Sequence, residues 1–301
     1  MEITSLTYFL EIVRQGNISR AAAALHVTQP ALTRQMQRLE EELGVRLFAR
    51  GRKIRLTDAG QMLKDRAEEI VRLSERTMAD LKNSQDVSGV ISIGMGIFSA
   101  NILLSEIMEA FSAAHPHVRF ALYVNTADDV SDRIERSLLD FGLMLQPVDV
   151  TKFSYIELRE TERMGLLLRT SHPLAEKGYA EAADLKSVPL IVPSRQSVQN
   201  LLEHALGISL EELRIFAENN ICPASIHFVR HGTALLLAAE GACTDYLHDG
   251  LTFIPLKPQY ASSTVFVWNK HLALTGAQRK FLDFFQDRLA QYRSGINERT
   301  S

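Results

Sequence analysis

Apolar residues recur at helical spacing along the first 60 residues, and this pattern predicts three short helices. The first helix should end at Gly16, because glycine is common just after the last turn of a helix. Ser19 is placed to cap a second, alanine-rich helix, and Thr28 to cap a third that has Pro30 in its first turn. The third helix should bury one face, which carries Leu32, Met36 and Leu39.

The opposite face of the third helix is polar and carries Gln29, Thr33, Arg34, Gln37 and Arg38. Two helices joined by a short turn, the second with such residues in its N-terminal half, are typical of a helix-turn-helix that reads the major groove. Glutamine can pair with adenine, arginine with guanine, and a threonine methyl group can pack on thymine. The alternative is a solvent-exposed face on an ordinary three-helix bundle.

A basic hairpin is expected after the third helix. Alternating apolar residues in 45–50 and 53–56 flank the turn Gly51-Arg52, and the tip of the hairpin is almost wholly basic. Such a hairpin suits a wing that contacts the phosphate backbone. Together with the alanine-rich helix, which permits close helix packing, it favours DNA binding over the ordinary bundle.

A single long helix is expected from residue 58 to about residue 87, because this stretch lacks proline and begins with the capping-box pattern of Asp58 and Gln61. Residues along it alternate by four and three positions, as in a coiled-coil seam: Leu63, Ala67, Ile70, Ser74, Thr77 and Leu81. The seam fits either a dimer contact or an amphipathic helix that lies on its own domain. The dimer gains support because proteins that read the major groove usually bind two half-sites.

The rest of the chain alternates strands with helices, which predicts an α/β fold with mainly parallel sheets covered by helices. The expected strands are residues 90–94, 118–124, 141–145, 164–169, 190–192, 215–217, 253–254 and 264–268. The expected helices are residues 102–114, 131–138, 198–206, 232–239 and 277–292. In such a fold, ligands bind beyond the carboxyl ends of the strands.

Six residues just after expected strands are the candidate ligand contacts: Ser99, Asn101, Asn125, Thr126, Ser194 and Arg195. Converging helix N-termini with hydroxyl side chains suit an anion, particularly a carboxylate. We therefore expect a small organic anion as the ligand. The alternative for each of these residues is an ordinary helix cap.

The stretch AAAALHVTQPALTRQMQRLEEELGVRLFAR, followed by LTDAG, closely resembles the LysR-type transcriptional regulators, and the match is nearly continuous from Leu6 to Gly60. The resemblance implies an α/β protein with a winged helix-turn-helix domain, a linker and dimerisation helix, and a periplasmic-binding-protein-like effector domain of two α/β subdomains. The implied boundaries are 1–58 for the DNA-binding domain, 59–87 for the linker helix, 88–161 with 268–301 for the first subdomain, and 162–267 for the second.

The resemblance also implies that Gln29, Thr33 and Arg34 read bases and that the wing contacts phosphates. The full set of predicted DNA-binding residues is Gln29, Pro30, Thr33, Arg34, Arg38, Arg50, Arg52, Lys53 and Arg55. The residues predicted to mediate dimerisation are Leu63, Ala67, Ile70 and Leu81. The implied partners are double-stranded DNA, a small-molecule effector, further copies of the chain in a dimer or tetramer, and RNA polymerase if the regulator is an activator.

The distribution of charge agrees with a nucleic-acid-binding head. The whole chain has a net charge of −3, but residues 1–60 carry nine basic and six acidic residues, a net charge of +3. Residues 88–301 carry 19 basic and 24 acidic residues, a net charge of −5. A small basic part therefore precedes a large acidic one.

Composition excludes several other classes. No apolar run approaches the ~18 residues that cross a bilayer, and the N-terminus lacks the features of an export signal, so we expect a cytoplasmic protein without a membrane partner. The two cysteines, Cys222 and Cys243, are too few for a disulfide framework, and buried structural thiols explain them better than a redox sensor. His227 and His231 could share a helix face, but they have no evident third metal ligand.

Two other function classes fit the second part of the chain alone. A solute-binding module would not explain the head, and it would require an export signal. An α/β enzyme would require catalytic signatures, and the sequence has no phosphate-binding glycine-rich loop, G-x-S-x-G elbow or metal-ligand constellation. We therefore predict a regulator that is not an enzyme and has no cofactor. The chain departs from the family pattern at residues 241–245, where relatives tend to have a glycine pair and a proline.

Overall fold

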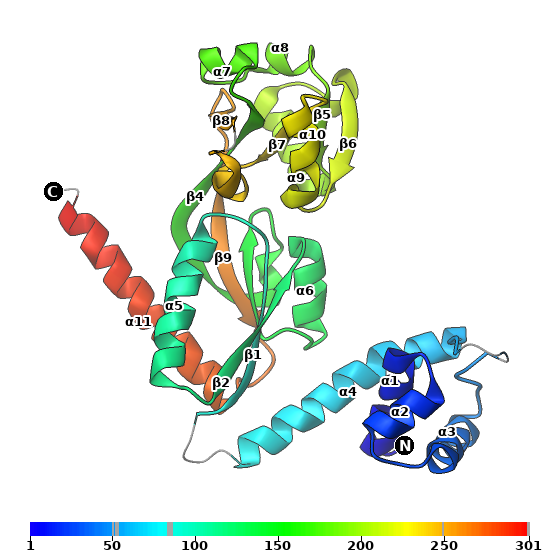
Figure 1. Cartoon of the computed structure of the whole chain (residues 1–301). Helices are drawn as coiled ribbons and strands as arrows, with labels where there is room; N and C mark the ends of the chain where they lie inside the picture. Colours follow the sequence, from blue (N-terminus) through cyan, green and yellow to red (C-terminus); the bar gives the residue numbers. More distant parts are fainter. Residues whose placement is uncertain (50, 52–53, 83–86, 249, 300–301) are drawn as a thin grey trace. The chain divides into compact units, whose positions relative to one another are not determined.

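The structure is a computed structural model of the chain and describes residues 1–49, 51, 54–82, 87–248 and 250–299 (Figure 1). The chain divides into two compact units, one formed mainly by residues 1–86 and the other mainly by residues 87–301. Residues 1–57 are termed the head, and residues 87–301 the body. None of the described helices is long and apolar enough to cross a membrane.

Three helices form the head: α1 (Ile3–Gln15), α2 (Ile18–Ala24) and α3 (Gln29–Leu43). One apolar cluster lies between them. The predicted buried face of α3 is confirmed, because Leu32, Met36 and Leu39 all lie in this cluster. Ala21 and Ala22 of α2 are buried beside them, and their small side chains let the helices approach closely.

The helix ends in the head are set by local hydrogen bonds. Gly16 follows α1 with a φ of 61°, which confirms the predicted end of that helix. The Thr28 hydroxyl accepts a hydrogen bond from the Ala31 N–H at 3.4 Å, which confirms the predicted cap of α3. The prediction that Ser19 caps α2 is wrong. Asn17 is the cap, because its side-chain oxygen accepts the backbone N–H three residues further on at 3.0 Å.

The hairpin after α3 is described only in part. Among its described residues, an antiparallel bridge joins Phe48 to Leu56, where the sequence predicts two strands. Gly60 lies against the base of this hairpin so closely that a Cβ atom there would be 2.1 Å from the Leu47 carbonyl oxygen, so only glycine fits. Three of the predicted wing residues lie outside the described residues: Arg50, Arg52 and Lys53.

The predicted long helix is α4 (Asp58–Lys82). The Thr57 hydroxyl accepts the Gly60 N–H at 3.0 Å and so caps the helix, a role that the sequence pattern gave to a box of Asp58 and Gln61. Ala67 is completely buried in the apolar cluster of the head, and Leu63 packs against that cluster. The first half of α4 therefore lies on its own domain.

The body contains one nine-stranded sheet of order β2-β1-β3-β9-β4-β7-β5-β6, in which β8 pairs with β4. The strands are β1 (Gly89–Met95), β2 (Val118–Val124), β3 (Phe141–Leu145), β4 (Phe153–Arg169), β5 (Leu190–Pro193), β6 (Ile215–Asn219), β7 (Leu235–Ala239), β8 (Leu251–Pro255) and β9 (Ala261–Asn269). The α-helices are α5 (Ala100–Ala114), α6 (Ala127–Glu135), α7 (Pro173–Lys177), α8 (Ala182–Leu185), α9 (Gln196–Leu206), α10 (Ile226–His231) and α11 (Gly276–Arg299).

Each half of the sheet has a parallel centre, as predicted. Strand β1 pairs in parallel with β2 and β3, and β5 pairs in parallel with β6 and β7. The long strands β4 and β9 are antiparallel to their neighbours and run between the two halves (Figure 1). The half around β1 is termed subdomain I, and the half around β5 subdomain II.

Strand β9 leads the chain back to subdomain I, where Thr264 pairs with Leu145 at the end of β3. Ser262, Ser263 and Thr264 precede the apolar part of β9, and only the pairing with β3 shows where subdomain I begins again. The boundary therefore depends on contacts between distant parts of the chain.

Two predicted helices differ from the structure. Residues 235–239 form strand β7, not part of a helix over 232–239, because this short apolar run is buried between β4 and β5. Such a run does not by itself distinguish a strand from a buried helix. Helix α6 begins at Ala127, four residues before the predicted start at residue 131, and ends at Glu135.

Aromatic side chains form the centre of subdomain I. Phe141 and Phe266 lie on neighbouring strands and are buried, as are Phe281 and Phe285 on α11. The rings of Phe266 and Phe285 stack with their centroids 4.2 Å apart. The last helix therefore packs on subdomain I, as predicted.

Candidate functional site

The first candidate site is the polar face of α3. Gln29, Pro30, Arg34 and Arg38 are exposed on it, and Thr33 is half-buried. Within the described part of the chain, no ion pair engages Arg34 or Arg38. This face therefore presents two guanidinium groups that are free to bind an external partner.

Several hydrogen bonds fix this helix in the head. Gln35 of α3 donates to the Ser5 hydroxyl at 2.8 Å and ties α3 to α1. Glu40 accepts the backbone N–H groups of Leu47 and Phe48 at 2.7 and 3.2 Å, which joins α3 to the base of the hairpin. The predicted DNA contacts on α3 are thus presented by a rigid support, as precise base recognition requires.

Gln29 is oriented by a neighbour from α2. The Ser19 hydroxyl donates to the Gln29 side-chain oxygen at 3.2 Å. The amide N–H groups of Gln29 have no partner among the described residues, so they remain available to an acceptor on a base. Arg55, at the far end of the hairpin, is exposed.

The second candidate site is a cavity of about 160 Å³ in the body, between subdomains I and II. Its walls are mostly apolar, with Phe98, Val124 and Leu145 from subdomain I and Val198 and Leu237 from subdomain II. Loops that follow β1, β2, β5 and β6 contribute to the lining, so the cavity lies at the carboxyl ends of parallel strands.

The structure brings three of the six predicted ligand contacts to this cavity: Asn125, Thr126 and Arg195 line it. The others, Ser99, Asn101 and Ser194, do not belong to its lining. The Ser99 and Ser194 side chains are exposed, and the Asn101 amide donates to the Gly96 carbonyl oxygen at 2.9 Å. The binding role of all six residues stays a prediction.

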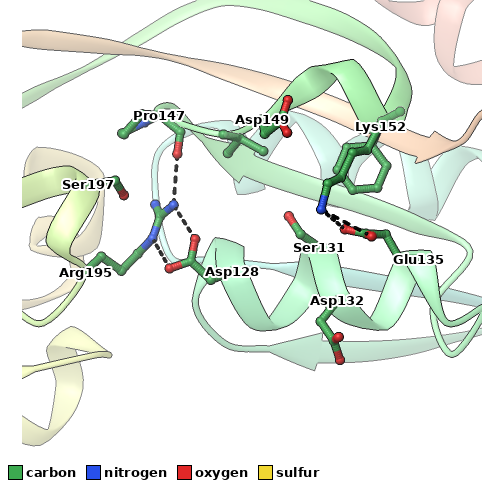
Figure 2. Close-up of a pocket in the computed structure, with 11 residues that line it drawn as sticks. Asp128, Ser131, Asp132, Glu135, Pro147, Asp149, Lys152, Arg195 and Ser197 are labelled. Carbon is green, nitrogen blue, oxygen red and sulfur yellow. Dashed lines mark hydrogen bonds and ion pairs between the residues drawn. The ribbon is translucent and has the colours of Figure 1, made fainter.

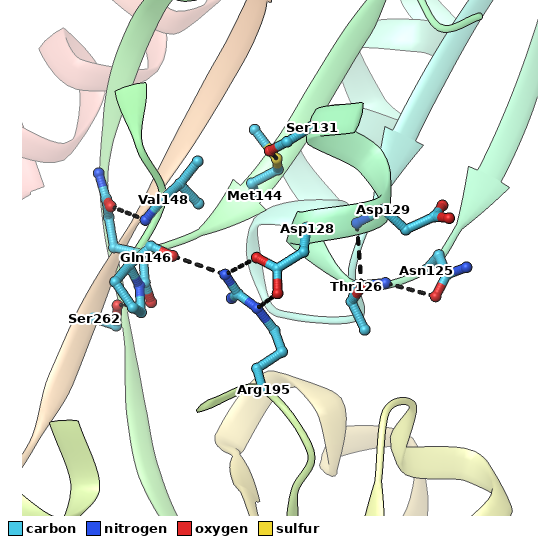
Figure 3. A network of polar contacts seen from close by, with 11 residues as sticks. Asn125, Thr126, Asp128, Asp129, Ser131, Met144, Gln146, Val148, Arg195 and Ser262 are labelled. Atoms are coloured by element: carbon cyan, nitrogen blue, oxygen red, sulfur yellow. Dashed lines mark hydrogen bonds and ion pairs between the residues drawn. The ribbon is translucent and has the colours of Figure 1, made fainter. Parts of the chain in front are cut away.

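Arg195 of subdomain II is held by two groups of subdomain I, as Figure 3 shows. Its guanidinium group donates to both carboxylate oxygens of Asp128, with N–O distances of 2.7 and 3.2 Å. It also donates to the Pro147 carbonyl oxygen at 2.9 Å. Only 14% of the Arg195 side chain is exposed, so this bidentate pair closes one side of the cavity.

A wider groove of about 650 Å³ lies beyond the Arg195–Asp128 pair (Figure 2). Its acidic side chains outnumber its basic ones, Lys152 and Arg195. They are Asp128, Asp132 and Glu135 of α6 and Asp149 of the loop after β3. Lys152 pairs with Glu135 at 3.0 Å, and this pair raises the pKa of the lysine. Ser197, in the first turn of α9, lines this outer groove.

A buried glutamate that the sequence analysis missed connects the two subdomains. Glu162 of β4 is 1% exposed. One of its carboxyl oxygens accepts the Ser99 N–H at the start of α5, and the other accepts the Gly241 N–H of subdomain II at 2.9 Å. A Cβ atom on Gly241 would lie 2.1 Å from the Ser99 nitrogen, so the close approach requires glycine. The departure from the family pattern at residue 241 was the only sequence signal here.

The two cysteines are buried in one apolar cluster, as the sequence predicts. A hydrogen bond with Cys222 and burial raise the pKa of the Cys243 thiol, so the thiolate is disfavoured. His227 and His231 are exposed on α10. No group of three or more possible metal-ligating side chains occurs among residues 1–49, 51, 54–82, 87–248 and 250–299.

Comparisons with known proteins find a family match for each part of the chain. Residues 3–61 match the bacterial regulatory helix-turn-helix proteins of the lysR family, and residues 84–290 match the LysR substrate binding domain. The chain is 27% identical over 223 residues to the HTH-type transcriptional regulator YtlI of Bacillus subtilis (strain 168), with 71% of each protein covered. It is 26% identical over 295 residues to the HTH-type transcriptional regulator BsdA of the same organism, with 97% of this chain and 98% of BsdA covered.

The fold is also similar to that of solved structures. A crystal structure of full-length CbnR complexed with its target DNA superposes with a TM-score of 0.71 at 24% sequence identity. The alignment covers 97% of this chain and 99% of the CbnR chain. The similarity therefore extends over the head, the linker helix and the body.

Proposed function

The chain belongs to the LysR family of bacterial transcriptional regulators, and from this membership we propose that α3 reads base pairs in target DNA while the cavity of the body binds a small organic effector. Regulators of this family combine a helix-turn-helix with an effector-binding domain. In our proposal, the occupied cavity changes how two DNA-binding heads are held, and this change alters transcription.

The observation that carries the DNA-binding role is the unpaired polar face of α3. Gln29 and Arg34 are exposed near the N-terminus of a helix whose opposite face is buried. An arginine without an internal carboxylate partner can form a bidentate pair with guanine, and the oriented Gln29 amide can pair with adenine. Arg38 and Arg55 are exposed, and we assign phosphate contacts to them. The same role is proposed for the wing residues Arg50, Arg52 and Lys53, which lie outside the described residues.

The test of this role is selection of genomic DNA fragments by the full-length chain, followed by footprinting of the recovered fragments. We expect the fragments to share two related half-sites about one helical turn, or a multiple of a turn, apart. Binding should weaken as salt increases, because phosphate contacts release counterions. Fragments without any shared sequence would contradict the proposed function.

We also propose that the second half of α4 pairs with its copy in a second chain. Ala67 is used by the head itself, so the predicted seam cannot extend over the whole helix. Ile70, Leu73 and Met78 are 37%, 53% and 50% exposed, and they leave an apolar stretch without a partner in the described part of the chain. The side chain of Leu81, the last residue of the predicted seam, lies outside the described residues.

A dimer of this kind would join two heads, and the two heads would bind the two half-sites of an operator. A tetramer, and a contact with RNA polymerase in an activator, are further proposals from family membership. The same membership favours a regulator over an enzyme, and we propose no reaction for the cavity.

A further inference from the structure

We propose that the cavity takes a compact, mainly apolar ligand whose polar group is uncharged, and that the chain's own carboxylates exclude organic anions from it. This inference rests on the proposed function, because it names the chemical class of the effector. It also replaces the organic anion that the sequence analysis expects.

The size of the cavity limits the ligand. A volume of about 160 Å³ is close to that of an apolar cavity of about 150 Å³ that holds one benzene molecule in another protein. The apolar side chains Phe98, Val124 and Leu237 form much of the wall. A single ring or a branched chain of four or five carbons would fill this space, and each buried apolar group would contribute to affinity.

The first place where an anion would bind is already filled. The N-terminus of a helix of 15 residues such as α5 attracts negative charge, because its first N–H groups have no partner within the helix. Here the Ser99 N–H donates to Glu162, which is itself almost completely buried. A ligand carboxylate at this point would have to displace the glutamate and leave a buried charge unpaired.

The second place is filled by Asp128. Arg195 is the one charged residue among the described residues that line the cavity, and both oxygens of Asp128 already occupy its guanidinium group. A ligand carboxylate next to Arg195 would lie close to the Asp128 carboxylate, and two like charges in contact repel each other strongly. Two further helix starts contribute to the lining. Thr126 and Ala127 lie at the start of α6, whose first turn carries the carboxylates of Asp128 and Asp129, and Arg195 and Val198 lie at the start of α9, where Asp128 holds Arg195.

The polar groups that remain in the lining are neutral. The Thr126 oxygen accepts only a long hydrogen bond of 3.4 Å from the Asp129 N–H, so its own hydroxyl proton is available. Asn220 lines the cavity, and no hydrogen bond engages its side chain within the described part of the chain. A ligand amide, hydroxyl or carbonyl group can bond to these side chains without bringing a charge out of water.

Matched pairs of small molecules test the inference on the full-length chain. Benzamide and benzoate have the same ring, and isovaleramide and isovalerate have the same branched chain. Isothermal titration calorimetry should give an affinity for each amide that is at least about tenfold higher than for its carboxylate partner, because like charges in contact are strongly unfavourable. Tighter binding of both carboxylates would overturn the inference.

Two variants decide whether Asp128 is the cause. The Asp128→Asn variant removes the charge that occupies Arg195, so the affinity for benzoate should rise about tenfold while that for benzamide changes little. The Asp132→Asn variant is the control, because it removes another acidic group of the same helix that also lines the outer groove. An unchanged preference for amides in Asp128→Asn would show that Asp128 does not select the ligand.

Operator binding by the same preparations separates this inference from the proposed function. If neither member of either pair binds although the chain footprints its operator, the ligand class proposed for this cavity is wrong and the regulatory role stands. If the chain shows no sequence preference on DNA, the proposed function is wrong whatever the cavity binds.

Discussion

Helix α3 of the head and helix α5 of the body begin at positions that look alike in the sequence. Each has a hydroxyl residue before its first turn, Thr28 for α3 and Ser99 for α5. In the head, the residues at the start of α3 are exposed, and no carboxylate of the described residues binds Arg34. In the body, the start of α5 is occupied by the Glu162 carboxyl group, which lies 63 positions further along the chain.

The difference shows that the tertiary structure decides whether a helix start is open to an external ligand. Both helices have the same unpaired N–H groups at the start and the same dipole direction. The start of α5 binds a carboxylate from a distant part of the chain, whereas the start of α3 has only its own Thr28 cap and presents exposed side chains to an external partner. Substitutions can remove the internal partners and the open groups in turn.

The largest effect should come from Glu162→Gln. The amide places an N–H group against either the Ser99 or the Gly241 N–H, so one buried hydrogen bond is lost and two donors face each other. We expect the free energy of unfolding of the body to fall by about 2–4 kcal/mol. Urea unfolding checks this, with Glu157→Gln, an exposed glutamate of the same strand, as the control. Equal stability of both variants would mean that the start of α5 does not need its internal partner.

The next effect concerns an apolar residue that α4 leaves open. Ile70→Asp should weaken the dimer by about 2–3 kcal/mol, because it places a charge in an apolar contact. Sedimentation velocity measures the dimer population, and operator affinity should fall with it. The exposed Met62, at 70% exposure on the part of α4 that lies on the head, provides the control variant Met62→Asp. A dimer that survives Ile70→Asp would place the contact elsewhere.

Arg34→Ala tests the open face of α3 directly. Loss of one bidentate base contact should weaken binding to the selected DNA by about 1–3 kcal/mol and change binding to random DNA much less. Fluorescence anisotropy on both kinds of DNA measures the two losses. Arg14→Ala is the control, because Arg14 already pairs with Glu11 at 2.6 Å. Equal losses on both DNA molecules would contradict a base-reading role.

A smaller change should follow loss of the local cap of α3. Thr28→Ala removes the acceptor of the Ala31 N–H, and we expect the head to lose about 1 kcal/mol of stability. Hydrogen exchange of the amides in the first turn of α3 checks this. A loss as large as that of Glu162→Gln would mean that the two helix starts do not differ as described.

The smallest effect concerns a helix cap whose stabilisation depends on pH. The neutral His172 ring accepts the Leu174 N–H at 3.2 Å and caps α7, and burial lowers the pKa of this histidine from its ordinary value of 6.5. The unfolded chain therefore takes up a proton first as the pH falls. The stabilisation is present above about pH 6.5 and is lost as the pH drops through the folded pKa, by less than about 1 kcal/mol. The melting temperature of His172→Asn should lack this dependence, since asparagine caps without titrating.

The sequence predicted elements well where contacts are local. The end of α1 at Gly16, the Thr28 cap and the buried face of α3 depend on residues within a few positions of one another. Strands β2 and β3 were predicted with the observed bounds, because their apolar runs end at clear breaks. Residues 232–239 were predicted as helix, because only pairing with β4 and β5 makes residues 235–239 a strand.

The candidate ligand site was less predictable for the same reason. Asn125, Thr126 and Arg195 were found from their places after strands, and all three line the cavity. Glu162 was not found, since its partners Ser99 and Gly241 lie 63 and 79 positions away in the chain. No periodic pattern marks a buried carboxylate of this kind. The expectation of an anion rests on helix starts alone, and the contacts that Glu162 and Asp128 make there cannot be read from the sequence.

The two strands that join the subdomains also limit which motions can carry a signal. Residues 161–163 of β4 pair with residues 261–263 of β9, so the two connections are bonded to each other where they cross. Sliding one strand by a single residue would turn its side chains to the opposite face of the sheet and expose the buried Glu162. Bending or twisting about this ribbon would keep each side chain on its own face of the sheet. The irregular pairing between Glu157 and Thr161 is where the ribbon can flex. We therefore expect an effector to act on this joint by bending or twisting it, and to transmit its signal as a rotation.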